Sequence, residues 1–505
     1  MKNSKIRKVT LVNMITSLML QIVSIIAGFI IPKLVLESFG SEVNGVVSSI
    51  NQFLNYITLA EGGFTSIIYA NLYKPLVEND EEKISKILYS SKKFYNKISF
   101  LYIGYSIILA VVYPLVVDSS FSYEYVFSLV LILSLKLLIQ YMFSLTLRTL
   151  LIADKKLYIN SIVQIFLTII QIVITFFVVK LYPNIHILKL VTALAYILQP
   201  LVFGLYIRKH YNLDLSKKAN KDNHDDVSIS KQRWNGFAVH FASFVNQSTD
   251  ITILTILSLL TDISVYSVYA LVTTSLGGLV TAITTGLNSS LGHDFARNNL
   301  NEINDKLDSY EYIMNLLSFF LFGVAGLLIT PFVLIYTQNV VDANYNQPLF
   351  GVLLCISAVI KLIRLPHSNL AYAANKYKEI KYPAFIQVAI NVVLSIVLVF
   401  PLGLNGIIIG TIVSMIYKTV FHIYFTKKII GRKQLIFYKK IVVFVITTAI
   451  GVLLSIAFVP AVNVDILSWV VHGLIYSGIF IVLFAIMSFL FFRKELKNFY
   501  NYLKR

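Results

Sequence analysis

The sequence is poor in cysteine and in charged residues. Its single cysteine, Cys355, cannot form an intramolecular disulfide, so a disulfide framework and a cysteine-based metal site are both excluded. Charged residues make up 13% of the chain, whereas a soluble domain contains about 25%. With 57% hydrophobic residues and a mean hydropathy of +0.75, the chain is expected to be an integral membrane protein that crosses the bilayer many times.

Acidic residues are also scarce. The chain has 43 basic and 25 acidic residues, which gives a formal net charge of +18. Such an excess could indicate nucleic-acid binding. We exclude a nucleic-acid partner because the basic residues are dispersed among the connections between apolar segments.

Long apolar runs indicate an all-α integral membrane fold with about fourteen transmembrane helices. The expected spans are residues 9–36, 43–73, 94–117, 123–151, 157–181, 185–207, 234–260, 264–292, 308–337, 346–374, 379–401, 405–427, 436–459 and 465–492.

The distribution of basic residues predicts the orientation. One set of alternate connections, together with both chain ends, contains about 36 of the 43 basic residues, and the opposite set contains Lys180 and Lys189. The positive-inside rule therefore places both termini in the cytoplasm. The opposite connections are short. This argues against a polytopic polymerase or glycosyltransferase, because such an enzyme needs a sizeable external loop or an acidic pair near the outer surface. We expect a transporter, not an enzyme, and no catalytic residue.

The spans divide into two six-helix lobes and an extra C-terminal pair. The expected parts are an N-terminal lobe (1–209), a cytoplasmic linker (210–233), a second lobe (234–430), and helices 13 and 14 with a basic tail (431–505). The fourth span of each lobe ends in a similar sequence, Ala153-Asp154-Lys155 and Ala374-Asn375-Lys376. We therefore expect two parallel repeats, an architecture typical of alternating-access transporters.

Seven charged residues are expected within spans, six of them near mid-depth. The basic residues are Lys33, Lys136, Lys361, Arg364 and Lys418, and the acidic residues are Glu61 and Asp250. A charge near the bilayer centre costs about 2.5–3.5 kcal/mol on insertion scales, so such residues are expected to face a protein interior or a wet cavity. Either the cations bind an anionic substrate, or they pair with acids elsewhere in the bundle and hold helices together.

Lys361 and Arg364 are the strongest candidates for substrate binding. They lie three residues apart in the apolar run 347–374, so they share one face of a helix. Their charge suits a phosphate or pyrophosphate, which arginine can bind through two parallel hydrogen bonds. Lys136 and Lys418 are further candidates. Lys33 is a weaker one, because it lies toward the outer end of its span and could extend to the interface.

Glu61 and Asp250 are candidates for ion coupling. A carboxylate in an apolar bundle can take up H⁺, and the polar neighbours of Asp250 also suit Na⁺. For each residue, a salt bridge to one of the lysines is the alternative. No metal site and no cofactor other than a coupling H⁺ or Na⁺ are expected. His240, His367 and His422 are expected to be packing residues.

Several segments, taken in order, carry a family resemblance. They are Leu72–Leu76, Leu150–Lys155, Asp250, Asn391–Leu398 and Gly403–Thr411. Together with the fourteen spans, they resemble the Wzx-type flippases. These form the polysaccharide-transporter branch of the MATE/MOP-like superfamily, which exports drugs, oligosaccharidyl lipids and polysaccharides. The resemblance covers nearly the whole chain.

The resemblance implies a V-shaped pair of six-helix lobes in the bacterial cytoplasmic membrane. It implies a flippase that moves an undecaprenyl-pyrophosphate-linked oligosaccharide to the outer leaflet for surface polysaccharide biosynthesis. Ion coupling or the membrane potential would drive transport. The implied partners are this lipid-linked oligosaccharide, membrane lipids, and polysaccharide polymerase and assembly proteins.

Two details of the resemblance concern particular spans. In the related lipid II flippases, a groove beside the last two helices is thought to hold the lipid tail, which would give spans 13 and 14 a role. Those relatives concentrate cations in the first span, where this chain has Lys33 alone. An ion-coupled drug or metabolite exporter of the same fold is the main alternative. It predicts an acid-rich cavity, which four mid-depth cations against two acids disfavour.

Overall fold

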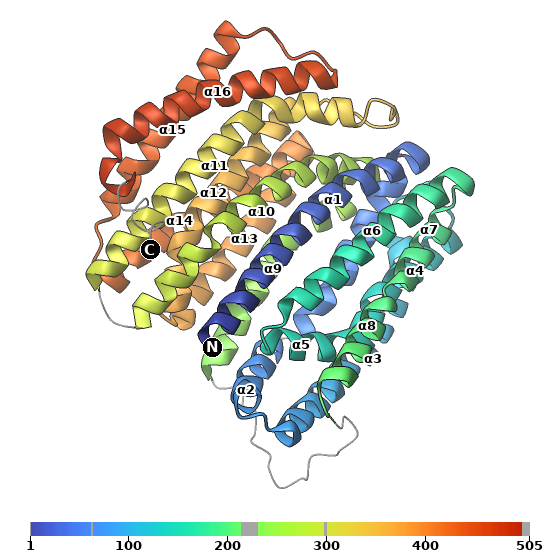
Figure 1. Cartoon of the computed structure of the whole chain (residues 1–505). Coiled ribbons are helices and arrows are strands. Elements are labelled where there is room, and N and C mark those ends of the chain that lie inside the picture. The colour runs from blue at the N-terminus through green and yellow to red at the C-terminus, as the bar shows by residue number, and fades with distance from the viewer. Residues whose placement is uncertain (1, 62–63, 214–230, 297–299, 497–505) are drawn as a thin grey trace. The chain divides into compact units, whose positions relative to one another are not determined.

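The chain is helical in a computed structural model (Figure 1), which describes residues 2–61, 64–213, 231–296 and 300–496. The helices are α1 (Lys2–Asn55), the 3₁₀-helix η1 (Tyr56–Glu61), α2 (Phe64–Glu78), α3 (Glu81–Val116), α4 (Tyr123–Ile139), the π-helix η2 (Gln140–Ser144), α5 (Leu145–Ala153), α6 (Leu157–Leu181), α7 (Ile185–Ala195), α8 (Leu198–His210), α9 (Lys231–Leu257), α10 (Leu260–Ala296), α11 (Leu300–Tyr336), α12 (Pro348–Ala373), α13 (Tyr377–Leu402), α14 (Leu404–Ile430), α15 (Gln434–Phe458) and α16 (Ile466–Phe491). These described ranges contain no strand, which confirms the all-α class.

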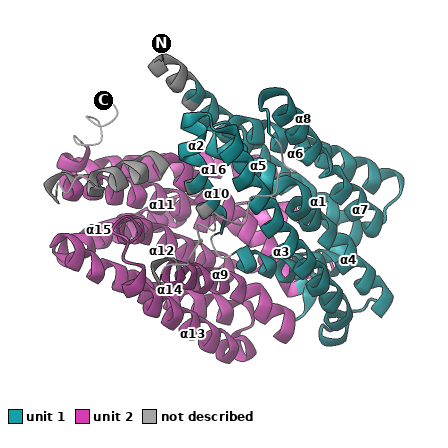
Figure 2. Cartoon of the chain, turned by 90° about the horizontal axis from the view of Figure 1, so that it is seen from below, with its two compact units in different colours: residues 1–230, 259–261 teal, residues 231–258, 262–505 magenta. Residues whose placement is uncertain are grey.

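The helices form two compact units (Figure 2). Unit 1 comprises residues 1–230 and 259–261, and unit 2 comprises residues 231–258 and 262–505. Helices α1–α8 therefore belong to unit 1, and α9 and α11–α16 belong to unit 2, with nearly all of α10. Most of the predicted linker lies outside the described residues, and the predicted lobe boundaries stay predictions.

Twelve helical segments among the described residues are long and apolar enough to cross a membrane. One of them, Leu11–Glu61, covers most of the first two expected spans, since Gly40 interrupts α1 with a φ of 82°, a conformation that glycine adopts readily. Helix α9, another expected span, is not among the twelve. The polar run from Asn246 to Asp250 lowers its hydropathy. About fourteen spans therefore remain consistent with the described helices.

The turns after α5 and α12 support the predicted repeat at the level of single hydrogen bonds. The N–H groups of Asp154, Lys155 and Lys156 donate to the carbonyls of residues 150, 152 and 151. Those of residues 374, 375 and 376 donate to the carbonyls of 370, 372 and 371, in the same pattern. Lys155 and Asn375 both have a positive φ, of 60° and 54°. The repeats therefore align with Lys155 on Asn375, one residue away from the alignment suggested by the sequence.

Two glycines bring the backbones of α13 and α14 into contact. A Cβ on Gly406 would overlap the main-chain carbonyl of Leu398, and a Cβ on Gly410 would lie 2.7 Å from the main-chain nitrogen of Ser395. Small residues four apart are typical of close helix packing in membranes. The close packing of α13 against α14 therefore requires glycine at both positions.

We expect Gly406→Ala to lower the free energy of unfolding of unit 2 by about 1–3 kcal/mol, because an added methyl group must push α13 and α14 apart. Denaturant titration of the purified protein in micelles measures this change. The matched control is Gly326→Ala on α11, where a Cβ would meet no atom within 4 Å. Equal effects of the two substitutions would contradict the close contact.

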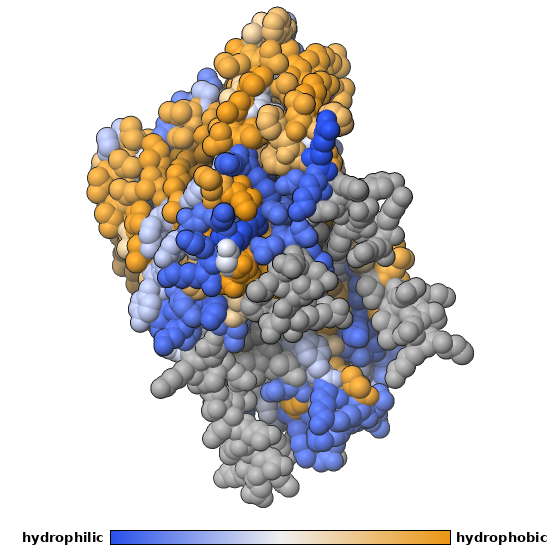
Figure 3. All heavy atoms as spheres, turned by 90° about the vertical axis from the view of Figure 1, so that its left-hand side faces the viewer, coloured by the Kyte–Doolittle hydropathy of each residue, from blue (hydrophilic) through white to orange (hydrophobic). Residues whose placement is uncertain are grey.

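Helices α15 and α16 pack against the rest of unit 2 through aromatic side chains. The cluster includes Phe319 of α11, Phe444 of α15, and Phe480 and Phe484 of α16. The opposite faces of α15 and α16 are apolar and exposed, and this hydrophobic surface covers the upper part of the view in Figure 3. A helix that is apolar on all sides fits contact with lipid. The predicted role of this pair in binding a lipid tail stays a prediction.

Candidate functional site

Unit 2 contains a cavity of about 620 Å³ that is lined by α9, α10, α12, α13 and α14. Four of the predicted site residues line it, namely Asp250, Lys361, Arg364 and Lys418. Its polar lining also includes hydroxyls and amides from Ser243, Asn246, Gln247, Tyr266, Thr273, Thr274, Thr281, Ser357, Ser368, Tyr372, Gln387 and Thr411. The cavity therefore combines fixed cations with many hydrogen-bonding groups.

The three cations of the cavity come from two facing helices. Lys361 and Arg364 lie on one face of α12, as their spacing predicts, and Lys418 lies on α14. Helices α12 and α14 pack side by side over much of their length. Lys361 is exposed to the cavity, Arg364 is half-buried, and Lys418 is 5% exposed.

These cations have no acidic partner among the described residues. No described carboxylate lies within ion-pair distance of any of them, and Nε and Nη1 of Arg364 are buried without a hydrogen-bond partner in the described part of the chain. In the alternative interpretation, the cations pair with acids and only hold helices together. The described residues contain no such ion pairs. A cluster of like charges in a protein cavity, without an acidic partner, is costly, and an anionic ligand would compensate it.

Asp250 lies in a hydrogen-bond network and makes no salt bridge with a described basic residue. Thr411 of α14 donates to Oδ1 of Asp250 at 2.7 Å, and Tyr266 of α10 donates to Oδ2 at 2.9 Å. Thr411 Oγ1 also lies 3.1 Å from Oδ1 of Asn391, whose Nδ2 donates to Oδ1 of Asn246 at 3.2 Å. Oxygen atoms from α9, α10, α13 and α14 therefore converge beside the carboxylate. Such an arrangement suits a proton or a hard cation.

In unit 1, Glu61 is part of a hydroxyl network. Tyr141 donates to Oε1 of Glu61 at 2.6 Å, and Thr65 donates to Oε2 at 3.2 Å. The hydroxyl of Thr65 lies 2.8 Å from that of Tyr95. The carboxylate makes no ion pair with a described basic residue, so the alternative interpretation, a salt bridge to a lysine, is not observed there. Gly62 and Gly63, which follow it, lie outside the described residues.

The two remaining predicted cations also lie in unit 1. Lys136 lies over the ring of Tyr196, with its Nζ 4.6 Å from the ring centre. Lys33 lies 3.9 Å from Glu37, one turn further along α1. The structure therefore brings three of the five predicted cations into one cavity. Lys136 and Lys33 both belong to unit 1 and do not line this cavity.

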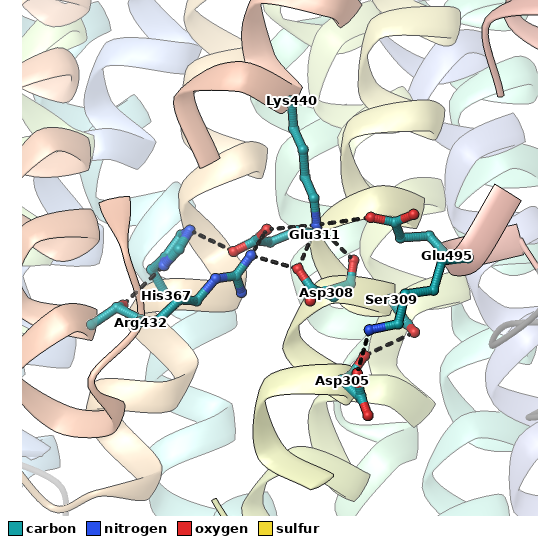
Figure 4. Close-up of polar contacts among 10 residues, drawn as sticks. Asp305, Asp308, Ser309, Glu311, His367, Arg432, Lys440 and Glu495 are labelled. Carbon is teal, nitrogen blue, oxygen red and sulfur yellow. Dashed lines mark hydrogen bonds and ion pairs between the residues drawn. The ribbon is translucent and has the colours of Figure 1, made fainter. Parts of the chain in front are cut away.

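Sequence analysis missed a buried ionic cluster in unit 2 (Figure 4). Arg432 donates to Asp308 at 2.6 Å and to Glu311 at 2.7 Å, and Lys440 lies 2.6 Å and 3.3 Å from the same two carboxylates. Lys440 also lies 3.5 Å from Glu495. His367 of α12 lies 3.2 Å from Glu311. The cluster therefore connects α11, α12 and α15 with the segments after α14 and α16.

This cluster corrects the assignment of two basic residues. Arg432 and Lys440 are among the basic residues that we assigned to the cytoplasmic connections, where attraction to anionic lipids would explain them, but they are 8% and 5% exposed. Asp308 and Glu311, with which both of them pair, lie more than a hundred residues away in the sequence. The spacing of Asp308 and Glu311, three residues apart at the start of an apolar run, was the available signal.

Solved structures place the fold among known ones. No family model matches the chain, and no curated protein sequence matches it. The structure of a lipid II flippase, MurJ, in an inward closed conformation has 16% identity and a TM-score of 0.72, over 96% of this chain and 100% of that one.

Multidrug transporters of the MATE family have the same fold. An inward-facing MATE structure of the MOP superfamily has 13% identity and a TM-score of 0.60, over 82% of this chain and 98% of that one. The MATE multidrug transporter DinF-BH has 14% identity and a TM-score of 0.53, over 85% of this chain and 96% of that one. At these identities the similarity shows the fold alone, and the predicted MATE/MOP-like fold is confirmed.

Proposed function

We propose that this chain is a flippase that moves an undecaprenyl-pyrophosphate-linked oligosaccharide repeat unit across the bacterial cytoplasmic membrane by alternating access, for surface polysaccharide biosynthesis. The observation that supports this most is the set of unpaired cations in the cavity of unit 2. A pyrophosphate would neutralise them, and arginine would bind it through parallel hydrogen bonds. The surrounding hydroxyls and amides suit a sugar. The fold shared with a lipid II flippase supports the same class of cargo.

The proposal gives each charged residue a role. Lys361, Arg364 and Lys418 bind the pyrophosphate. Lys136 and Lys33 of unit 1 contribute further positive charge on the substrate path. These roles follow from charge and, for the first three, from their position in the cavity.

Asp250 and Glu61 are proposed to bind the coupling ion, H⁺ or Na⁺. Each carboxylate is surrounded by hydroxyl groups and makes no ion pair with a described basic residue. No other cofactor is proposed. Both termini are proposed to lie in the cytoplasm, and the polysaccharide polymerase and assembly proteins are the proposed protein partners.

The experiment that tests this function uses cells depleted of the protein. Undecaprenyl-linked intermediates are extracted, and their leaflet is determined with a membrane-impermeant probe. We expect a complete oligosaccharide repeat to accumulate on the cytoplasmic leaflet, and wild-type protein to reverse the accumulation. Unchanged intermediates together with unchanged surface glycan would overturn the flippase proposal.

An ion-coupled drug or metabolite exporter is the second candidate. The fold shared with MATE multidrug transporters and the acid in the cavity, Asp250, favour it. Three cations around one acid argue against a cationic drug as the cargo. A drug-susceptibility panel on the depleted cells separates the two functions. Increased susceptibility without accumulated intermediates would support the exporter. A polytopic polysaccharide polymerase is the third and least supported candidate.

A further inference from the structure

Glu311 and His367 form a buried carboxylate–imidazole pair in unit 2. Oε1 of Glu311 on α11 lies 3.2 Å from Nε2 of His367 on α12, and the two side chains are 0% and 1% exposed. Neither of these atoms has a hydrogen bond of good geometry in the described structure, although they face each other (Figure 4). Two polar atoms this deeply buried need a proton between them, because two facing lone pairs repel each other.

The other ring nitrogen of His367 indicates where the ring proton lies. Nδ1 is 2.9 Å from the hydroxyl of Thr426 on α14. That hydroxyl donates to the main-chain carbonyl of His422, also at 2.9 Å, so its oxygen is left to accept. Nδ1 of His367 is therefore the donor, and a neutral ring has no hydrogen on Nε2. The contact with Glu311 then requires one additional proton, on either partner.

The charges of the ionic cluster lead to the same result independently. Asp308, Glu311 and Glu495 are acidic, and Arg432 and Lys440 are basic. With a neutral histidine, the cluster has one more negative than positive charge. One proton shared by Glu311 and His367 makes it neutral, which a buried cluster favours strongly.

The groups that face this pair come from every helix around it. Titratable and charged neighbours of the pair are Asp308 on α11, His422 on α14, Arg432 after α14 and Lys440 on α15, and Glu495 after α16 lies against Lys440. The ring of Phe437 packs edge-on against that of His367, at 4.9 Å between centroids. The pair has apolar packing on one side and ionic groups on the other. A proton is therefore expected to reach it from the side of the ionic cluster.

The pair also lies close to the cavity. His367 follows Arg364 by three residues on α12, and His422 follows Lys418 by four residues on α14, so each is one helical turn from a cavity cation. His422 is 2% exposed, and its Nδ1 is buried without a hydrogen-bond partner in the described part of the chain. Two histidines therefore lie between the cavity and the ionic cluster.

We propose that Glu311 and His367 form a proton-binding site that stores one proton and exchanges it with the cytoplasm through the ionic cluster. The proton moves between Nε2 of His367 and Oε1 of Glu311, and on release it passes to water and leaves the cluster with one negative charge. The cytoplasmic side is the one that the positive-inside rule assigns to the basic tail. Use of this proton for transport rests on the proposed function, whereas its binding does not.

Nitrogen-15 NMR of the histidine-labelled full-length protein in bilayers tests the site, with infrared spectroscopy for the carboxyl group. His367→Gln and Glu311→Gln assign the signals. His240→Gln and Glu379→Gln, both at exposed positions, are the matched controls. We expect either a doubly protonated His367 ring with an ionised Glu311, or an Nδ1–H ring with a protonated Glu311. A neutral His367 ring of either tautomer beside an ionised Glu311 would overturn the proposal.

A second variant keeps the test valid if Glu311→Gln fails to fold. Thr426→Val removes the acceptor of Nδ1–H and leaves every charge in place. We expect the share of the Nε2–H tautomer of His367 to rise about fivefold, as the loss of one hydrogen bond predicts. In a singly protonated ring, an unchanged tautomer ratio would show that Thr426 does not fix the ring and would overturn the argument. These spectra do not depend on the transported substrate. A negative result here would overturn the proton site and leave the flippase proposal in place, and the accumulation experiment would do the reverse.

Discussion

Replacement of Arg432 by methionine is expected to lower the free energy of unfolding of unit 2 by about 3–5 kcal/mol. The guanidinium donates to Asp308 at 2.6 Å and to Glu311 at 2.7 Å, and Glu311 is fully buried. Methionine has a similar length but no charge, so both carboxylates lose a partner, and at the fully buried Glu311 water cannot replace it. Denaturant titration in micelles measures the change.

The matched control is Lys433→Met, because Lys433 is the next residue and is exposed. We expect that control to change the free energy of unfolding by about 0.5 kcal/mol or less. The double variant Arg432→Met with Glu311→Gln should recover part of the loss, because it also removes one of the two uncompensated carboxylates. Strictly additive losses in the double variant would show that Arg432 and Glu311 do not interact as the structure describes.

Sequence patterns predicted the parts of this molecule that depend on one helix at a time. The apolar runs predicted the spans, and the spacing of Lys361 and Arg364 predicted their shared face on α12. The polar run Asn246–Asp250 predicted polar neighbours for Asp250, and Asn246 and Gln247 line the same cavity. Each of these signals lies within a single helical segment, where periodicity and the cost of burying charge are sufficient.

Contacts between helices could not be predicted in this way. Arg432 and Asp308 are 124 residues apart, and no local pattern marks them as partners. Their burial follows from the packing of α11, α14 and α15, which a single sequence does not specify. The repeat was predicted, but its alignment was displaced by one residue. The left-handed conformation of Lys155, unusual for a lysine, is evident only from the backbone.

Removal of the cavity cations is expected to affect transport and stability in opposite directions. The double variant Lys361→Ala with Arg364→Ala should lower flipping by about 100-fold or more, because it removes two charge-assisted contacts to the pyrophosphate. Arg364→Lys keeps the charge and loses the planar fork, so an intermediate loss of about tenfold is expected. The measurement is how fast each variant clears the accumulated lipid-linked oligosaccharide from depleted cells.

The stability of these variants distinguishes a binding site from a structural one. Lys361, Arg364 and Lys418 repel one another, and no described carboxylate pairs with them. Their charges therefore destabilise the folded protein when no anion is bound. Lys418→Met should therefore raise the free energy of unfolding while it lowers transport, a trade-off typical of functional sites. Lys427→Ala, an exposed cation on the same helix, should change neither. If Lys418→Met destabilises the protein instead, the cation has a structural role, and the anion site must be sought elsewhere.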